Sequence, residues 1–136
     1  MNAPLLIKKN VILKKYSTIF VGGYAKYFAS VCNMEDLQNC LAFVKKNNLK
    51  VFVLGKGSNC LISDKGFDGL VIRNKIELCQ FDKNLVKVGA GFPIAKLSSF
   101  TVNKNLSGLE FACAIPASVG GAVYMNAGAN NQEMKD

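Results

Sequence analysis

The sequence predicts a mixed fold of strands and helices, and three observations carry this prediction. A strand–helix–strand pattern covers residues 27–54, a strand-like run ends in a glycine-rich turn at residues 55–59, and a segment of small residues covers residues 108–128. The chain has 136 residues, of which 50% are hydrophobic and 19% are charged. This composition suits one compact domain, or one domain with a small subdomain.

The first elements are an apolar and basic lead-in and two strand-like runs. Residues 1–15 form the lead-in, residues 16–25 form a run that Gly22 and Gly23 interrupt, and residues 27–31 form a second strand. We expect the aromatic side chains of these runs to lie in the core rather than to form a base-stacking platform. They are Phe20, Tyr24, Tyr27 and Phe28.

A helix is predicted to begin after Asn33, which is a typical N-cap residue. Two acidic residues follow in the first turn, where the helix dipole favours negative charge. Apolar residues then recur at helical spacing and predict one buried stripe. They are Met34, Leu37, Leu41 and Val44. The helix ends at residues 45–48, and a short buried strand follows at residues 50–54.

The turn after this strand is the main candidate for a binding site. It consists of Gly55, Lys56, Gly57, Ser58 and Asn59. Glycine permits a positive φ and a close approach of the backbone to a ligand. Free backbone N–H groups, with a hydroxyl and an amide beside them, form an anion-binding nest, and Lys56 adds positive charge. The pattern therefore predicts a site for the pyrophosphate of a cofactor.

The remaining elements alternate between strands and helices. They are a strand at residues 70–72, a hairpin that joins residues 76–79 to residues 85–88, and a helix at residues 94–104 with Pro93 near its start. In this helix Ile94, Leu97 and Thr101 are expected to face inward. The small residues at 108–128 have two interpretations, tight packing between core elements or close approach to a flat ligand, and the composition favours neither.

Composition excludes several kinds of catalytic and metal site. The chain contains no histidine, so it has no histidine-based triad and no histidine general base. Its five cysteines are widely spaced without a CxxC motif, which argues against a zinc site, and we expect most of them to be small buried hydrophobes. We therefore expect no bound metal.

The net charge of +8 is compatible with nucleic acid or with small anionic ligands. Sixteen of the seventeen cationic residues are lysines, which occur singly or in short pairs rather than in a long tract, and Arg73 is the only arginine. This pattern argues against nucleic acid. No apolar run approaches the roughly 20 residues that cross a membrane. The N-terminus also lacks the order of charge and apolar core that a signal peptide requires. We expect a cytoplasmic protein with no nucleic-acid or membrane partner.

Three separated segments resemble, in order, motifs of the UDP-N-acetylenolpyruvoylglucosamine reductase (MurB) family. They are TIFVGGYA at residues 18–25, LGKGSNCLISDKGFDGLVI at residues 54–72, and residues 108–128 together with Glu133. The resemblance covers about residues 16–136, and three ordered blocks are far more specific than one glycine turn. It implies an α+β FAD-binding fold of the vanillyl-alcohol-oxidase (PCMH) type with two subdomains.

The resemblance also implies how the chain is divided and where it binds FAD. Residues 16–74 would form the first subdomain, and residues 75–136 would begin the second and leave it incomplete. The turn at residues 55–59 would hold the FAD pyrophosphate, and a second segment would lie along the cofactor. The residues of the second segment are Ile115, Pro116, Ser118, Val119, Gly120 and Gly121. Ala114 and Ala117 stand where the family usually has glycine, and their Cβ atoms would be unfavourable at a positive φ.

In the reaction of this family NADPH reduces the flavin, and the reduced flavin reduces the enolpyruvyl group of a UDP-sugar for peptidoglycan synthesis. The groups that assist this chemistry follow the matched segments, so the resemblance assigns no catalytic residue to this chain. We expect an FAD-binding part that is inactive alone, in an oligomeric state that the sequence does not predict. The alternatives are an FAD-binding module of another flavin-dependent oxidoreductase of the same fold and a basic nucleic-acid-binding domain.

Overall fold

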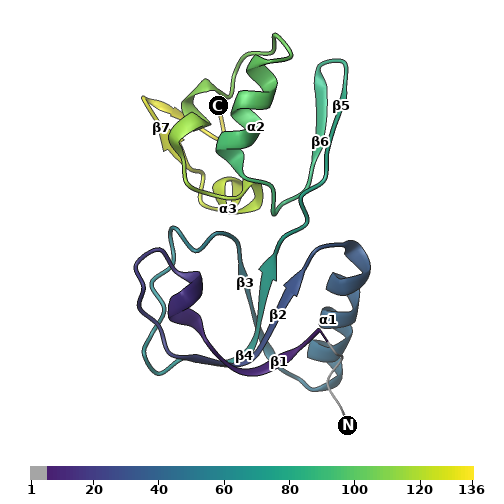
Figure 1. Cartoon of the computed structure of the whole chain (residues 1–136), viewed down its shortest axis with the longest axis vertical. Coiled ribbons are helices and arrows are strands. Elements are labelled where there is room, and N and C mark those ends of the chain that lie inside the picture. The colour runs from purple at the N-terminus through teal and green to yellow at the C-terminus, as the bar shows by residue number, and fades with distance from the viewer. Residues whose placement is uncertain (1–5) are drawn as a thin grey trace. The chain divides into compact units, whose positions relative to one another are not determined.

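The computed structural model describes residues 6–136 and divides into two compact units, residues 1–75 and residues 76–136 (Figure 1). Residues 1–5 of the predicted lead-in lie outside the described residues. The rest of the lead-in contributes a strand and a short 3-10 helix to the first unit.

A four-stranded sheet forms the centre of the first unit (Figure 1). Its strands in spatial order are β1 (Lys8–Ile12), β2 (Tyr24–Val31), β4 (Phe67–Asn74) and β3 (Lys50–Leu54). β1 is antiparallel to β2, whereas β2, β4 and β3 run parallel. The predicted strand–helix–strand unit is confirmed, and the strand that follows it, β4, inserts between its two strands.

The helix α1 (Met34–Lys46) begins as predicted, because the Asn33 side chain accepts a hydrogen bond of 2.8 Å from the Asp36 backbone N–H. The predicted apolar stripe is wrong at two of its four positions, since Met34 and Leu41 are 59% and 46% exposed. Cys40, which is buried, occupies the centre of the covered face. A free cysteine behaves as a small hydrophobe. The buried face of α1 therefore includes Cys40 and differs from the face that the larger apolar residues predict.

The strand β3 was expected to be buried, and this expectation is wrong. β3 pairs with β4 alone among the described strands, and its apolar residues Val51, Phe52 and Val53 are exposed, while Leu54 is buried. The interior strands are β2 and β4, and residues 70–72 of β4 are fully buried. A continuous apolar run is typical of a strand inside a parallel sheet, but the run itself does not distinguish a central strand from an edge strand.

The predicted strand-like run at residues 16–25 is largely wrong. Tyr16 ends the 3-10 helix η1 (Leu13–Tyr16), residues 17–23 form a loop, and β2 begins at Tyr24. The expectation of an aromatic core holds for Phe28, which is buried, but Phe20 is 75% exposed and Tyr24 is 61% exposed. Phe28 belongs to a buried core cluster of the first unit that also contains Leu13, Ala25, Leu54 and Val71.

The second unit begins with the hairpin of β5 (Cys79–Asp82) and β6 (Leu85–Val88), which confirms the predicted turn but places its first strand three residues later. The elements that follow are α2 (Ile94–Val102), the 3-10 helix η2 (Glu110–Ala114), α3 (Val119–Tyr124), and the short strands β7 (Gly128–Ala129) and β8 (Gln132–Glu133). Ile94, Leu97 and Thr101 of α2 are buried as predicted. Ile94 packs with Phe111, Ala112 and Ala122 in the core of this unit.

The cysteines are less buried than expected. Cys40 is buried, but Cys32 and Cys113 are exposed, and Cys60 and Cys79 are intermediate. All five are free thiols. Over the described residues, no helix is both long enough and apolar enough to cross a membrane.

Candidate functional site

The glycine turn Gly55–Asn59 lies where β3 ends, and its shape depends on contacts with the loop after η1. The Thr18 backbone N–H donates a hydrogen bond of 3.2 Å to the Gly57 carbonyl, and the Ser17 hydroxyl donates one of 3.2 Å to the Cys60 carbonyl. Gly57 has a φ of +74°, and a Cβ at this position would overlap the carbonyl oxygen of Tyr16. Only glycine fits here, for both conformational and steric reasons.

The backbone N–H groups of this turn are available to a ligand. Within the described part of the chain, the N–H groups of residues 56–59 donate no hydrogen bond to any other residue. Lys56 and Asn59 are exposed and Ser58 is half-buried, so solvent reaches the turn. Several unpaired donors on one glycine-containing turn, with a cationic side chain beside them, fit an anion such as a diphosphate.

A cysteine follows this turn but does not add a reactive group. Burial raises the pKa of the Cys60 thiol above its usual value of 9.0. The thiol therefore stays protonated at neutral pH, and a thiol is a much weaker nucleophile than a thiolate. The chemistry that the turn offers is anion binding.

The second predicted segment, which contains Ile115–Gly121, lies in the second unit and uses its donors internally. The N–H groups of Val119 and Gly120 donate to the carbonyls of Phe92 and Ala90, at 2.8 and 2.9 Å. A Cβ added to Gly120 would lie 2.8 Å from the Ala90 Cβ. Of the two interpretations that the sequence left open, tight packing therefore explains Gly120.

Other residues of the segment are also held by local contacts. Ser118 is buried and precedes α3, where its hydroxyl accepts a hydrogen bond from the Gly121 N–H at 3.3 Å. Ile115 and Val119 pack against the core of the unit, whereas Pro116 is exposed. Neither Ala114 nor Ala117 has a positive φ, so the Cβ atoms of these alanines fit the backbone. A role of this segment in cofactor binding stays a prediction.

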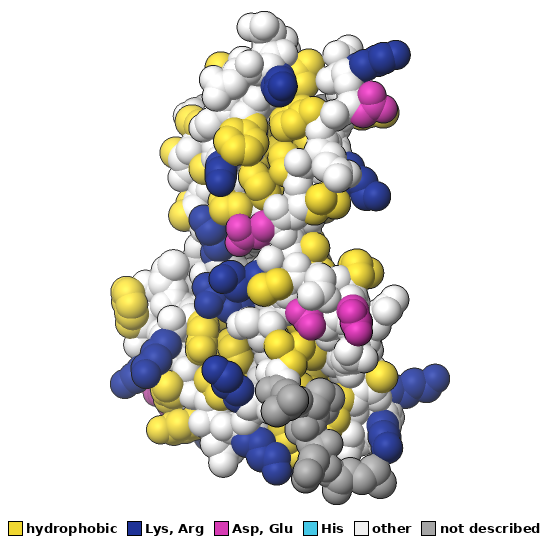
Figure 2. Space-filling view, turned by 45° about the vertical axis from the view of Figure 1, so that its right-hand side comes forward, with side chains coloured by type: hydrophobic (Ala, Val, Ile, Leu, Met, Phe, Trp, Pro, Cys, Tyr) yellow, Lys and Arg dark blue, Asp and Glu magenta, His cyan; other side chains and the backbone are white. Residues whose placement is uncertain are grey.

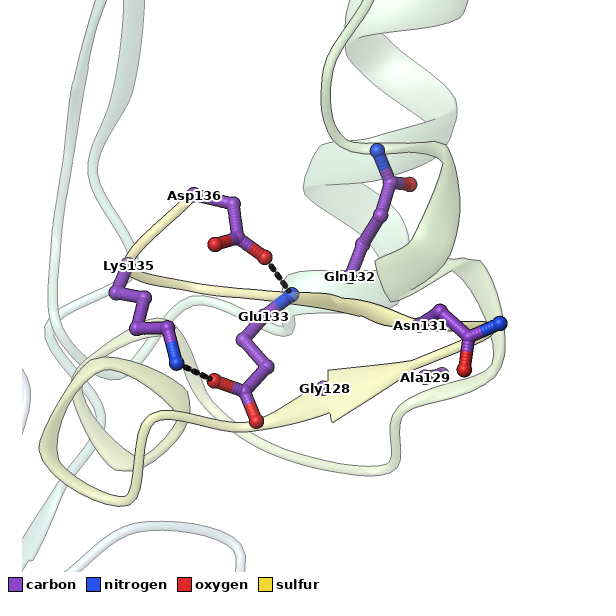
Figure 3. Close-up of a pocket in the computed structure, with 7 residues that line it drawn as sticks. All are labelled: Gly128, Ala129, Asn131, Gln132, Glu133, Lys135 and Asp136. Atoms are coloured by element: carbon purple, nitrogen blue, oxygen red, sulfur yellow. Dashed lines mark hydrogen bonds and ion pairs between the residues drawn. The ribbon is translucent and has the colours of Figure 1, made fainter.

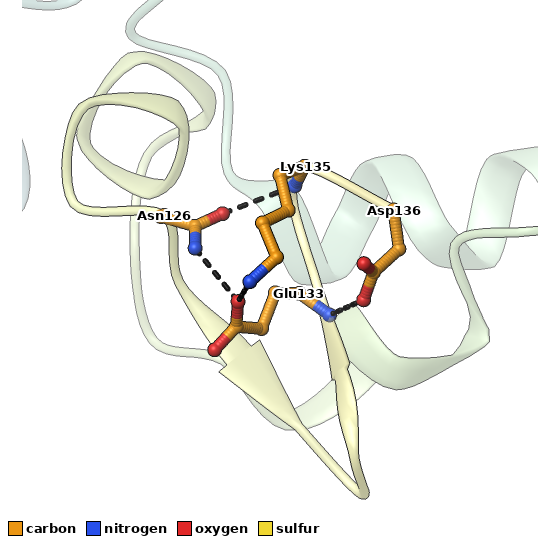
Figure 4. A network of polar contacts seen from close by, with 4 residues as sticks. All are labelled: Asn126, Glu133, Lys135 and Asp136. Atoms are coloured by element: carbon orange, nitrogen blue, oxygen red, sulfur yellow. Dashed lines mark hydrogen bonds and ion pairs between the residues drawn. The ribbon is translucent and has the colours of Figure 1, made fainter.

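A polar cluster at the β7–β8 hairpin lies outside the predicted cofactor-binding residues. Glu133 accepts hydrogen bonds from Lys135 and from the Asn126 amide, and its backbone N–H donates to Asp136 (Figure 4). The bonds from Lys135 and Asn126 hold the pKa of the Glu133 carboxyl below its usual range. The same hairpin lines a hollow of about 580 Å³ to which none of the predicted site residues contributes (Figure 3).

Comparison with known proteins identifies the class of protein to which the chain belongs. The FAD binding domain family matches residues 25–136, and the chain belongs to this family. The predicted α+β FAD-binding fold and the assignment of FAD as the cofactor of the family are thereby confirmed.

The relatives within this class share one name. The chain is 47% identical over 137 residues to the UDP-N-acetylenolpyruvoylglucosamine reductase of Protochlamydia amoebophila, covering 100% of the chain and 46% of the relative. It is 43% identical over 132 residues to the reductase of Chlamydia felis, covering 96% and 45%. The crystal structure of the Thermus caldophilus reductase (MurB) matches with a TM-score of 0.78 at 39% identity, covering 96% of this chain and 46% of that one. The resemblance to this reductase family is confirmed, and the chain spans just under half the length of these relatives.

Sequence reasoning missed one charged residue near the turn. Arg73 lies on β4 in register with Leu54, the residue directly before Gly55. Its position in the sheet depends on the insertion of β4 beside β3, which the order of the residues along the chain does not reveal. The only signal in the sequence is that Arg73 is the single arginine.

Proposed function

We propose that this chain is the FAD-binding portion of an NADPH-dependent reductase that converts UDP-N-acetylglucosamine enolpyruvate to UDP-N-acetylmuramate in peptidoglycan synthesis. The observation that carries the proposal is the turn of residues 56–59, whose N–H groups are unpaired within the described chain, inside a family match that extends over residues 25–136. The names of the relatives support the choice of reaction. A cytoplasmic location and use of NADPH belong to the same proposal.

Each part of the turn has a role in this function. The N–H groups of residues 56–59 bind the phosphate oxygens, Gly57 keeps the backbone in the required conformation, and Lys56 offsets the negative charge. FAD, when bound, supplies hydride transfer. We propose that the segment Ile115–Gly121 lines the cofactor, that residues 75–136 begin the second FAD-binding subdomain, and that this chain alone does not turn over.

Flavin titration tests the proposal. Purified chain is mixed with FAD, and the visible spectrum and flavin fluorescence are recorded for the native sequence, Gly57→Ala and Gly108→Ala. Gly108 also has a positive φ but no neighbouring atom within 4 Å of an added Cβ, so this variant places an L-residue at a positive φ without disturbing the turn. We expect FAD binding by the native chain and Gly108→Ala, and loss of binding by Gly57→Ala.

Two results would refute the proposal. One is the absence of a flavin signal together with salt-sensitive binding of an oligonucleotide, which would favour the nucleic-acid alternative. The other is oxidation of NADPH by the chain alone in the presence of a UDP-enolpyruvyl sugar, which would show that the chain contains the catalytic groups that we assign to the rest of the relatives' length.

A further inference from the structure

We propose that Arg73 is a further cofactor-binding residue, which binds the diphosphate beside the Gly55–Asn59 turn while the Tyr16 ring holds its guanidinium in place. This inference rests on the proposed function, because it assumes that the turn takes a phosphate-bearing ligand. Four observations support it: the register of β4, the contact with Tyr16, the absence of an ionic partner, and the distribution of charge.

The register of the sheet places Arg73 next to the turn. Arg73 pairs with Leu54 on β3, and the turn begins at the next residue. Residues in register on neighbouring strands project to the same face of a sheet. Arg73 therefore shares the face of Leu54, which belongs to the buried cluster that Tyr16 and Cys60 also contact. This is the face on which the loop after η1 holds the turn.

Tyr16 connects Arg73 to the turn physically. The guanidinium carbon of Arg73 lies 5.1 Å from the centroid of the Tyr16 ring, within the range of a cation–π contact. The ring in turn stacks on Phe28, with centroids 4.5 Å apart and planes inclined by 26°. The carbonyl of Tyr16 lies against Gly57, and Thr18 donates a hydrogen bond to Gly57. The same short segment thus positions both the guanidinium and the turn.

The guanidinium has no anionic partner within the described residues. The ion pairs found there are Lys26–Asp68 and Lys135–Glu133, and no side-chain hydrogen bond from Arg73 is present in residues 6–136. A guanidinium carries five N–H donors in a planar fork that matches phosphate geometry. A half-buried fork that lacks a carboxylate partner is available to a ligand and is suited to bidentate binding of a phosphate.

The charge of the chain is concentrated in the same unit. Residues 1–75 contain twelve lysine and arginine residues and four acidic ones, whereas residues 76–136 contain five of each. Figure 2 shows many lysine and arginine side chains over the visible face of the first unit. An excess of positive charge on one unit attracts a dianionic group to that unit.

The uniqueness of Arg73 allows a direct test by chemical labelling. An arginine-selective dicarbonyl such as phenylglyoxal has one arginine target in this chain, and mass spectrometry follows its modification. The native chain is labelled alone and with FAD, with ADP, and with riboflavin, which has no phosphate. At a ligand concentration ten times its Kd, we expect FAD and ADP to slow labelling about tenfold, since only the free protein reacts, and riboflavin to leave the rate unchanged.

Binding measurements on variants provide a second readout. We expect Arg73→Gln to weaken FAD binding by roughly 10- to 100-fold, the range for loss of hydrogen bonds to a charged group, and Arg73→Lys to recover part of this loss. Riboflavin binding should be the same in all variants. Lys26→Gln is the matched control, because it removes a cation from the same sheet that is already paired with Asp68, and its Kd for FAD should not change.

The outcomes separate this inference from the proposed function. If FAD binds while labelling of Arg73 is unprotected and Arg73→Gln keeps the native Kd, the role of Arg73 is refuted and the proposed function stands. If FAD does not bind but ADP protects Arg73, the anion site is supported and the flavin assignment fails. If neither FAD nor ADP protects Arg73, and FAD gives no binding signal, both are overturned.

Discussion

Replacing Gly57 by alanine tests whether the glycine turn is built as the structure indicates. Gly57 adopts a φ of +74°, and a Cβ at this position would overlap the Tyr16 carbonyl oxygen. The overlapping atom belongs to the backbone, so a side-chain rotation does not relieve the contact. Either the turn or the loop that contains Tyr16 must move.

The cost has two parts. An L-residue in the left-handed region costs roughly 1–2 kcal/mol, and forcing an extra methyl group into a packed site costs about 1–3 kcal/mol more. We therefore expect Gly57→Ala to lower the free energy of unfolding of the first unit by about 2–5 kcal/mol. Gly108→Ala, at a φ of +108° with no atom within 4 Å, pays only the first part and should cost about 1–2 kcal/mol in the second unit.

Amide hydrogen exchange read by mass spectrometry measures both effects, because it resolves the opening free energy of each segment. In Gly57→Ala, exchange should rise within residues 16–19, where the Thr18 N–H donates a hydrogen bond to the Gly57 carbonyl. In Gly108→Ala it should rise only near the substitution. Equal destabilisation by the two variants, or unchanged exchange at residues 16–19 in Gly57→Ala, would show that the Tyr16 contact does not constrain the turn.

Three further predictions concern the elements around the site. Asn33→Ala removes the acceptor for the Asp36 N–H and should lower stability by about 1 kcal/mol in urea unfolding, with no change if the cap is unimportant. Gly120→Ala should lower the stability of the second unit by roughly 1–3 kcal/mol, because the added Cβ would lie 2.8 Å from the Ala90 Cβ. Adding Ala90→Gly should restore the stability, and a double variant as unstable as the single one would contradict the packing argument. The pKa of Glu133 is lowered in the folded state, so the stabilisation by its carboxylate is complete above the ordinary pKa of 4.5 and is lost as the pH falls through the folded pKa. Amide exchange in the C-terminal hairpin should therefore accelerate at acid pH, and Glu133→Gln should remove this pH dependence.

Local signals predicted much of the fold correctly. The helix start at Asn33, the hairpin turn after β5 and the inward face of α2 each depend on residues close together in the chain. The glycine turn could also be predicted, because Gly55, Gly57, Ser58 and Asn59 directly follow an apolar run. Segments that differ only in their surroundings could not be assigned in this way. Phe20 and Phe28 are both aromatic residues in apolar runs, yet one is exposed and the other buried.

By itself the sequence determined the class of fold, the position of the glycine turn and the kinship with the reductases, since each is carried by short ordered motifs. Only the tertiary structure decided that β3 is an edge strand, that Gly120 serves packing against Ala90, and that Arg73 lies beside the turn. These three facts follow from which strand or loop lies next to which. The insertion of β4 beside β3 places Arg73 in register with Leu54, and the end of η1 places Tyr16 against Gly57. A contact between residues far apart in the chain leaves no periodic or local pattern in the sequence.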